Sequence, residues 1–163
     1  MQALTGSIAS SHVIKWLRAW YSEGMPDAID LEIVRQMLPS TPYGAGVREI
    51  KPPVEIIGDA FEGMLARDPD DHAVWGIAYN GKARGERQRF TIAHELGHFI
   101  LHRSQKQSFN CDSQSVHTGI DGLRQIEREA DEFASNLLMP GDLLREWISN
   151  QRIDLHVLSA IAK

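Results

Sequence analysis

The sequence is poor in cysteine, with only Cys111 among its 163 residues. A single cysteine excludes an internal disulfide and is typical of a protein in a reducing compartment, and we interpret Cys111, which lies in a polar loop, as an incidental free thiol. No apolar run approaches the ~20 residues that a membrane-spanning helix needs. The residues from Met1 to Ile8 have neither the basic start nor the apolar stretch of a secretory signal. We therefore expect a cytoplasmic protein.

An excess of positive charge is also absent. The chain has 17 Lys and Arg against 22 Asp and Glu, which gives a formal net charge of −5 at pH 7. Non-specific binding to DNA or RNA needs clustered positive charge, so we expect no direct contact with nucleic acid. Basic residues do gather between Lys82 and Arg89, a pattern that usually forms a solvated face. Within this run, Arg89 is the residue that we expect to contact substrate or to brace a site.

Length and composition predict one globular domain spanning 1–163. The chain is 42% hydrophobic and 24% charged, and it is long enough to bury a core. We expect an N-terminal helical piece over 1–38, a connection rich in Gly and Pro over 39–53, and a core over 54–163.

Helical periodicity appears toward both ends of the chain. It predicts a helix over 11–22 with a serine cap, and a second helix that runs from Asp27 or Asp30 to Leu38. Two more short helices are expected over 143–148 and 155–161.

Three short segments have the composition of strands, over 54–57, 61–67 and 74–79. We expect them to form a small antiparallel three-stranded sheet. The polar segment 103–119 has no periodicity and predicts a loop, for which we set out the hypothesis of a mobile lid.

The sequence H-E-L-G-H over 94–98 is the most informative motif. Four residues advance a helix by about one turn, so the imidazoles of His94 and His98 lie on one face, where they can share a zinc ion at ~2.0–2.1 Å. Glu95 is then placed to act on a metal-bound water as general base. A surface helix that merely carries these side chains is the simpler alternative. Gly97 costs ~1 kcal/mol against Ala in a helix, which is understandable if another element approaches closely there.

A catalytic zinc site needs a third protein ligand. The form of the motif with a third histidine requires Gly at 101 and His at 104, but the chain has Leu101 and Ser104. A carboxylate from a second helix is the other solution. The segment 120–140 has a helical period and ends at Pro140, so it predicts such a helix.

Two acidic residues of this segment, Glu127 and Asp131, are four positions apart on one helix face. This spacing suits a liganding carboxylate followed one turn later by a carboxylate that accepts the N–H of a zinc-bound imidazole. Asp131 as an ordinary solvated acid fits the spacing equally well. Glu129 points away from this face, and we expect it to be solvated.

Two strings together resemble the signatures of the ImmA/IrrE family of metallopeptidases. The first is R-F-T-I-A-H-E-L-G-H over 89–98, followed by F-I-L-H, and the second is E-x-E-A-D-x-F-A-x-x-L-L-M-P over 127–140. The resemblance implies an α+β, zincin-like fold in which the sheet packs on the active-site helix, with helices at the N- and C-terminal ends.

Carried over by position, the resemblance implies one zinc ion per chain, held by His94, His98 and Glu127. It implies Glu95 as the catalytic base and Asp131 as the partner that orients a liganding imidazole. Members of the family are bacterial or phage-encoded, and they typically cleave a helix-turn-helix repressor, which relieves repression. The resemblance alone suggests such a protein substrate.

The oxyanion of a peptidase reaction needs a further donor. The side chains that could donate a hydrogen bond to the oxyanion are those of Tyr79, His72, His102, His117 and Tyr43. The sequence does not decide among them. His102 lies roughly 80° away from the ligand face of its helix, so we do not expect it to bind zinc. An extended substrate could add as a strand beside 74–79.

Three functions remain open from the residues. The first is hydrolysis of an internal peptide bond. The second is a metal-containing binding or regulatory module that engages a repressor without cutting it. The third is oxygen chemistry on iron, since two histidines and a carboxylate also suit that metal. A glutamate beside the first histidine favours hydrolysis, because oxygen chemistry has no use for a base there.

Overall fold

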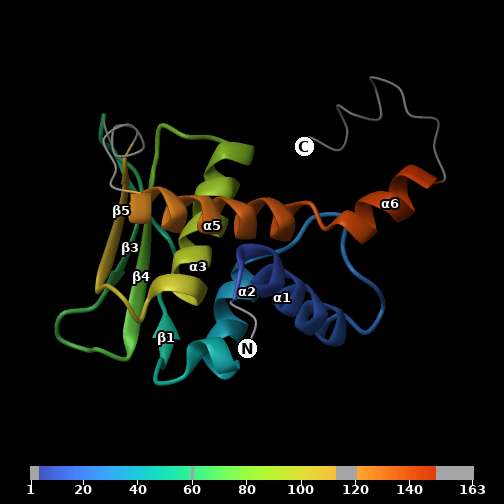
Figure 1. Cartoon of the computed structure of the whole chain (residues 1–163), viewed down its shortest axis with the longest axis horizontal. Coiled ribbons are helices and arrows are strands. Elements are labelled where there is room, and N and C mark those ends of the chain that lie inside the picture. The colour runs from blue at the N-terminus through green and yellow to red at the C-terminus, as the bar shows by residue number, and fades with distance from the viewer. Residues whose placement is uncertain (1–3, 60, 113–120, 150–163) are drawn as a thin grey trace.

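A computed structural model describes residues 4–59, 61–112 and 121–149 (Figure 1). The helices in these ranges are α1 (Gly6–Trp20), α2 (Leu31–Met37), α3 (Glu86–His102), α5 (Asp121–Leu138) and α6 (Gly141–Ser149), with short 3-10 turns at Leu38–Ser40 and Pro42–Gly44. The strands are β1 (Glu49–Ile50), β2 (Val54–Ile56), β3 (Phe61–Arg67), β4 (Val74–Asn80) and β5 (Ser108–Asp112). The fold is therefore α+β, as expected.

The strands form one mixed sheet, which corrects the expectation of a three-stranded antiparallel sheet. The three predicted strands are present as β2, β3 and β4, but β2 pairs in parallel with β4 instead of pairing with β3. β3 lies between β4 and β5 and is antiparallel to both, while β1 also pairs in parallel with β4. The alternation of apolar residues locates a strand but does not determine its neighbour, and neighbours in sequence are not always neighbours in a sheet.

β5 lies within the segment 103–119, which was predicted to be a loop. Its sequence, S-F-N-C-D, alternates polar and apolar residues, a strand pattern that is short enough to be missed. Phe109 is buried at 5% exposure, and Cys111 lies in the strand rather than in a loop. The remainder of the proposed lid, residues 113–120, lies outside the described residues.

The N-terminal helices begin where side-chain caps are present. α1 begins at Gly6, earlier than predicted, because the Thr5 hydroxyl accepts a hydrogen bond from the Ile8 amide. α2 begins after Asp30, one of the two predicted starts, whose carboxylate accepts from the Glu32 amide. The predicted helix over 143–148 is present within α6, whereas the one over 155–161 lies outside the described residues.

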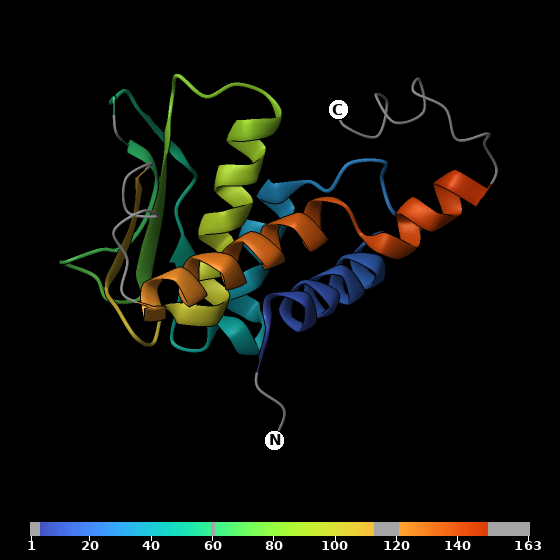
Figure 2. The ribbon, with the colours of Figure 1, turned by 45° about the horizontal axis from the view of Figure 1, so that its top comes forward.

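The helices stack on the sheet in two layers. α3 contacts β3 and β4, with the rings of Trp75 and Phe99 meeting edge to face at 5.9 Å, and α5 crosses α3 and also contacts α1 (Figures 1 and 2). Fully buried apolar side chains from all these elements form the core, among them Val13, Leu17, Leu65, Ile77, Leu96, Phe99, Phe133 and Leu137. In the described ranges, no helix is both long enough and apolar enough to cross a membrane.

The connection predicted over 39–53 contains the two 3-10 turns and β1. The side chain of Arg35 in α2 donates to the carbonyl of Ile50 in β1, so this connection is tied to the preceding helix. The division of the chain into three parts stays a prediction.

α3 and α5 approach most closely at Gly97 and Ala130. A Cβ atom at Gly97 would lie 3.2 Å from the Ala130 Cα and 3.0 Å from the Phe133 ring. The two helices therefore cross this closely because position 97 has no side chain, which agrees with the close approach expected there. This crossing places the first turns of α5 above the motif on α3.

Candidate metal centre

The two histidines of the motif lie on α3 and face the same space. The Nε2 atoms of His94 and His98 are 2.9 Å apart, and both residues are buried, at 8% and 0% exposure. One turn of helix separates them, so the fixed backbone holds the pair together.

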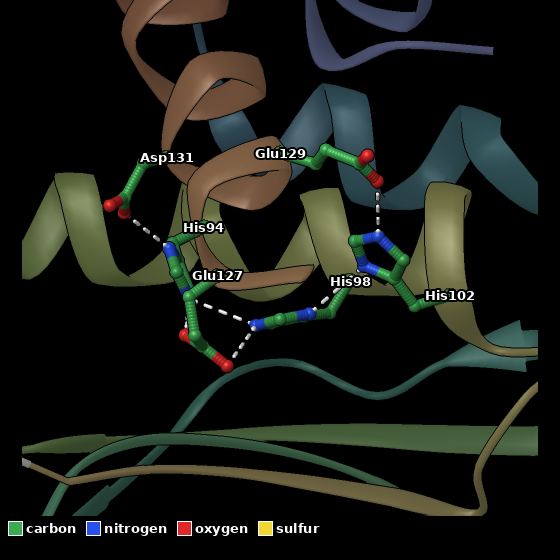
Figure 3. Close-up of polar contacts among 6 residues, drawn as sticks. All are labelled: His94, His98, His102, Glu127, Glu129 and Asp131. Atoms are coloured by element: carbon green, nitrogen blue, oxygen red, sulfur yellow. Dashed lines mark hydrogen bonds and ion pairs between the residues drawn. The ribbon is translucent and has the colours of Figure 1, made fainter. Parts of the chain in front are cut away.

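Glu127 reaches this pair from α5. Its carboxylate oxygens lie 3.2 Å from the His94 Nε2 and 3.5 Å from the His98 Nε2 (Figure 3). Two ligand atoms bound tetrahedrally at ~2.05 Å from a zinc ion would be about 3.3 Å apart, which is close to these distances. Among the described residues, these three side chains form the group able to hold a metal ion. The arrangement fits a site with three protein ligands and a fourth position for water or substrate.

Asp131, one turn beyond Glu127, lies beside the other nitrogen of His94. Its Oδ1 atom is 2.8 Å from the His94 Nδ1. A carboxylate only accepts, so the Nδ1 atom carries the proton and donates it, which leaves Nε2 directed at Glu127 and His98. The spacing of Glu127 and Asp131 leaves open both this contact and a solvated Asp131, and the resemblance implies the contact.

Glu129 and His102 form a second polar contact, which corrects the expectation that Glu129 is solvated. The Glu129 Oε2 lies 3.0 Å from the His102 Nε2, and the His102 Nδ1 lies 3.1 Å from the His98 Nδ1 (Figure 3). Glu129 is not solvated because α5 crosses α3 at Ala130, which lies between Glu129 and Asp131. The side chains of these two acids therefore extend to opposite sides of the crossing. Asp131 extends to His94, and Glu129 extends to His102. The group of side chains that could hold a metal ion among the described residues is His94, His98 and Glu127, and that His102 binds no zinc stays a prediction.

Glu95 is fully buried between α3 and the sheet. Its carboxylate faces Gly63 of β3, where a Cβ atom would lie 2.6 Å from both the Glu95 Oε1 and the Thr91 Cγ2. Gly63 therefore leaves the space that this carboxylate occupies. Sequence reasoning missed Gly63, although a glycine inside a strand often marks such a close approach.

The charges of the cluster act on one another. Burial lowers the pKa of His94, but hydrogen bonds to Asp131 and Glu127 and the charge of Glu95 outweigh it and raise the pKa to about 10. Burial lowers the pKa of His98. Burial raises the pKa of Glu127, yet the hydrogen bond with His94 and the closeness of His98, at 3.5 Å, hold it well below its usual range. Without metal, a proton therefore resides on His94 between carboxylates, in the place where a cation would bind.

A similar balance holds for Glu129. Burial raises the pKa of Glu129. The hydrogen bonds that it accepts from His102 and Gln125 lower the pKa by more than burial raises it, so the net shift is downward.

The remaining candidate residues lie outside the cluster. Tyr79 is on β4, directly opposite Gly63 in the register, and His72 is exposed in the turn between β3 and β4. Arg89 donates from Nη2 to the carbonyl of Ile29 at 2.7 Å, so it braces the start of α3 against the segment before α2. Tyr43 accepts or donates in a 2.6 Å hydrogen bond with the Nδ1 of His12 on α1. His117 lies outside the described residues.

The strand proposed to receive substrate, 74–79, is not at a sheet edge. β4 pairs with β3 on one side and with β1 and β2 on the other, so its backbone hydrogen-bonding groups are occupied. β5 ends the strand order, and the ring of Phe109 on β5 stacks on the ring of His98 at 4.7 Å. Within the described part of the chain, β5 is thus the edge strand that passes over the histidines.

A cavity of about 650 Å³ lies at the start of α3. Phe90, Thr91, Leu138 and Met139 contribute to its lining. None of His94, His98 and Glu127 lines it, and the lining residue Phe90 has its ring centroid 6.4 Å from that of His94.

Two similar proteins are both named radiation response metalloprotease IrrE. The protein from Deinococcus deserti is 36% identical over 85 residues, which cover 52% of this chain and 28% of the relative. The protein from Deinococcus radiodurans is 33% identical over 101 residues, which cover 60% of this chain and 28% of the relative. The match therefore spans less than a third of these relatives.

The model of one protein family matches a longer part of the chain. It describes the IrrE N-terminal-like domain and matches residues 55–163, a range that contains His94, Glu95, His98 and Glu127. This range is more than half of the sequence, and both signature strings lie within it. The chain belongs to the family of the IrrE N-terminal-like domain.

Proposed function

We propose that this protein is a zinc-dependent endopeptidase that hydrolyses an internal peptide bond in a protein substrate. The observation that carries the proposal is the convergence of His94, His98 and Glu127 on one point, with the buried Glu95 beside them. The name metalloprotease, given to both relatives, supports it. Two imidazoles and one carboxylate are a known catalytic zinc site, and the glutamate beside the first histidine supports hydrolysis on zinc over oxygen chemistry on iron.

His94, His98 and Glu127 would hold the zinc ion, which would supply the Lewis acidity that polarises a peptide carbonyl and lowers the pKa of bound water to about 7. The carboxylate of Glu95 accepts the proton of the attacking water and returns it to the leaving amine. Asp131 keeps the Nδ1 proton of His94 in place, so that Nε2 offers its lone pair to the metal. The cavity beside α3 offers Phe90, Leu138 and Met139 to a substrate side chain.

We infer that the substrate is a helix-turn-helix repressor encoded with this protein, whose cleavage would relieve repression in the cytoplasm. The two signature strings and the resemblance that they carry support this inference, and the lone cysteine supports the compartment. The net charge of −5 agrees with a protein substrate rather than a nucleic acid.

Substituting Glu95→Gln tests the catalytic proposal. Loss of the base should slow cleavage of the repressor by about 10²- to 10⁴-fold, since proton transfer contributes that much. Zinc content should stay at one ion per chain. The measurement is cleavage followed by mass spectrometry, with metal analysis of the same preparation, and Glu132→Gln on the exposed side of α5 is the control. Wild-type cleavage by Glu95→Gln would refute the assigned base.

Substituting Glu127→Ala tests the third ligand. Zinc affinity should fall sharply, because only two protein donors remain, and an unchanged affinity would show that α5 supplies no ligand. If the wild-type protein binds zinc and the repressor but leaves the repressor intact, the non-proteolytic binding module is the correct function.

A further inference from the structure

His102 is enclosed between a metal-binding histidine and an acidic residue. It is 1% exposed, and its two ring nitrogens lie 3.1 Å from the His98 Nδ1 and 3.0 Å from the Glu129 Oε2 (Figure 3). The Glu129 side chain is 26% exposed and comes from α5, whereas both histidines come from α3. The three side chains thus form a chain of contacts that leads from the surface to the metal site.

With His102 neutral, the chemistry of these groups sets the direction of each hydrogen bond. The Glu129 carboxylate only accepts, so the proton of a neutral His102 must be on Nε2. Its Nδ1 then carries a lone pair and accepts, so the proton of His98 must be on Nδ1. The remaining nitrogen of His98, Nε2, is therefore left with the lone pair, and this is the atom that faces His94 and Glu127.

The plane of the His98 ring is restrained as well. The ring of Phe109 stacks on it at 4.7 Å with an angle of 13° between the planes. His98 is fully buried, so water is not available to replace His102 as its partner. Stacking alone leaves the tautomer open, because it is indifferent to which nitrogen carries the proton.

We propose that Glu129 and His102 are positioning residues that hold His98 with its proton on Nδ1 and its Nε2 directed at the metal. This inference rests on the metal centre of the proposed function, and it does not depend on peptide cleavage. His94 has a direct carboxylate partner in Asp131, while His98 has an indirect one, with His102 inserted between the ring and the acid. The two arrangements lie on opposite sides of the crossing at Gly97 and Ala130.

Zinc affinity provides the first test. Glu129→Ala should weaken zinc binding about 10- to 100-fold, the usual effect of removing a group that orients a ligand. Glu129→Gln should recover part of this loss, because an amide oxygen also accepts a hydrogen bond from His102. The measurement is competition with a chromophoric chelator. Glu132→Ala, at an exposed position of the same helix, should bind zinc as the wild type does.

The tautomer of His98 provides the second test and needs neither zinc nor substrate. In the full chain without metal, two-bond ¹H–¹⁵N spectra should show the wild-type ring with its proton on Nδ1. In Glu129→Ala the ring should become a mixture of tautomers. Glu129 is partly exposed, so we expect this variant to fold, and circular dichroism of the same sample checks this.

The outcomes separate this inference from the proposed function. Wild-type zinc affinity together with an unchanged tautomer in Glu129→Ala would overturn the positioning role, whether or not the protein cleaves a repressor. Weaker zinc binding and a mixed tautomer would support the role even in a protein that cleaves nothing. Equal losses in Glu129→Ala and Glu129→Gln, with the tautomer unchanged, would also overturn it and would indicate that only the charge of Glu129 matters.

Discussion

At position 63, the lack of a side chain leaves room for a carboxylate. Gly63 lies inside β3, a central strand, where a glycine is otherwise unfavourable. The position is opposite Glu95 and Thr91, both on α3. Gly63 thus allows the carboxylate of Glu95, the residue that follows His94, to lie against the sheet.

Substituting Gly63→Ala should lower activity strongly and change zinc affinity little. The new methyl group would lie 2.6 Å from the Glu95 Oε1, so the carboxylate must move. A displacement of about 1 Å in a reacting group can cost about a hundredfold in rate. The measurement is kcat for cleavage of the proposed repressor substrate, alongside zinc affinity. Gly76→Ala on the adjacent β4 is the matched control, because nothing lies within 4 Å of its Cβ position. Equal activity in the two variants would contradict the role of Gly63.

The residues of the candidate site were predictable to different degrees. His94, Glu95 and His98 follow from one local motif, because helix geometry alone brings the two imidazoles together. Glu127 and Asp131 required the second signature string. Glu129 was misplaced because helical spacing describes a helix on its own and does not give the point at which another helix crosses it.

At the scale of elements, the crossing of α3 and α5 positions the metal centre. Gly97 and Ala130 are in contact at the crossing, and Glu127 precedes Ala130 by three residues. Any increase in the separation of the helices therefore moves Glu127 away from both histidines.

Substituting Gly97→Ala should weaken zinc binding. A Cβ at this position lies 3.2 Å from backbone atoms of Ala130, which can yield only if α5 shifts. Gly122→Ala in α5 is the control, since it meets nothing within 4 Å and should gain up to ~1 kcal/mol of helix propensity. Thermal unfolding and zinc titration of both variants provide the measurement. A Gly97→Ala protein with wild-type zinc affinity would show that the crossing tolerates a methyl group.

The elements themselves were largely predictable, whereas their pairing was not. The positions of β2, β3, β4 and α5 follow from local periodicity and from turn residues. β5 was missed because only two of its five residues are apolar. The parallel pairing of β2 with β4 depends on contacts between residues that are distant in sequence, which no local pattern contains.

At the scale of the whole molecule, the cluster links folding to pH. Without metal, the pKa of His94 is raised to about 10 from the ordinary 6.5. The protonated imidazole therefore stabilises the fold fully below pH 6.5, and this contribution is lost as the pH rises toward 10. Metal binding must displace the same proton from His94. The affinity for metal therefore rises with pH, whereas the stability of the metal-free fold falls.

We therefore expect zinc affinity to rise about tenfold per pH unit between about pH 7 and pH 9, as one proton is displaced. Over the same range, the free energy of unfolding of the metal-free protein should fall. Chelator competition and urea denaturation measure the two quantities. Asp131→Asn should flatten both dependences, because it removes a hydrogen bond that raises the pKa of His94. A zinc affinity independent of pH would contradict the proton on His94.

The division of the ligands between two helices has a consequence for biogenesis. His94 and His98 emerge from the ribosome together, whereas Glu127 emerges 29 residues after His98 (127 − 98) and reaches them only once α5 lies across α3. Until α5 has been synthesised, the nascent chain thus presents only two of the three donors. We therefore expect the metal to be loaded late in maturation, so that the proposed hydrolytic activity would not appear before α5 has packed on α3.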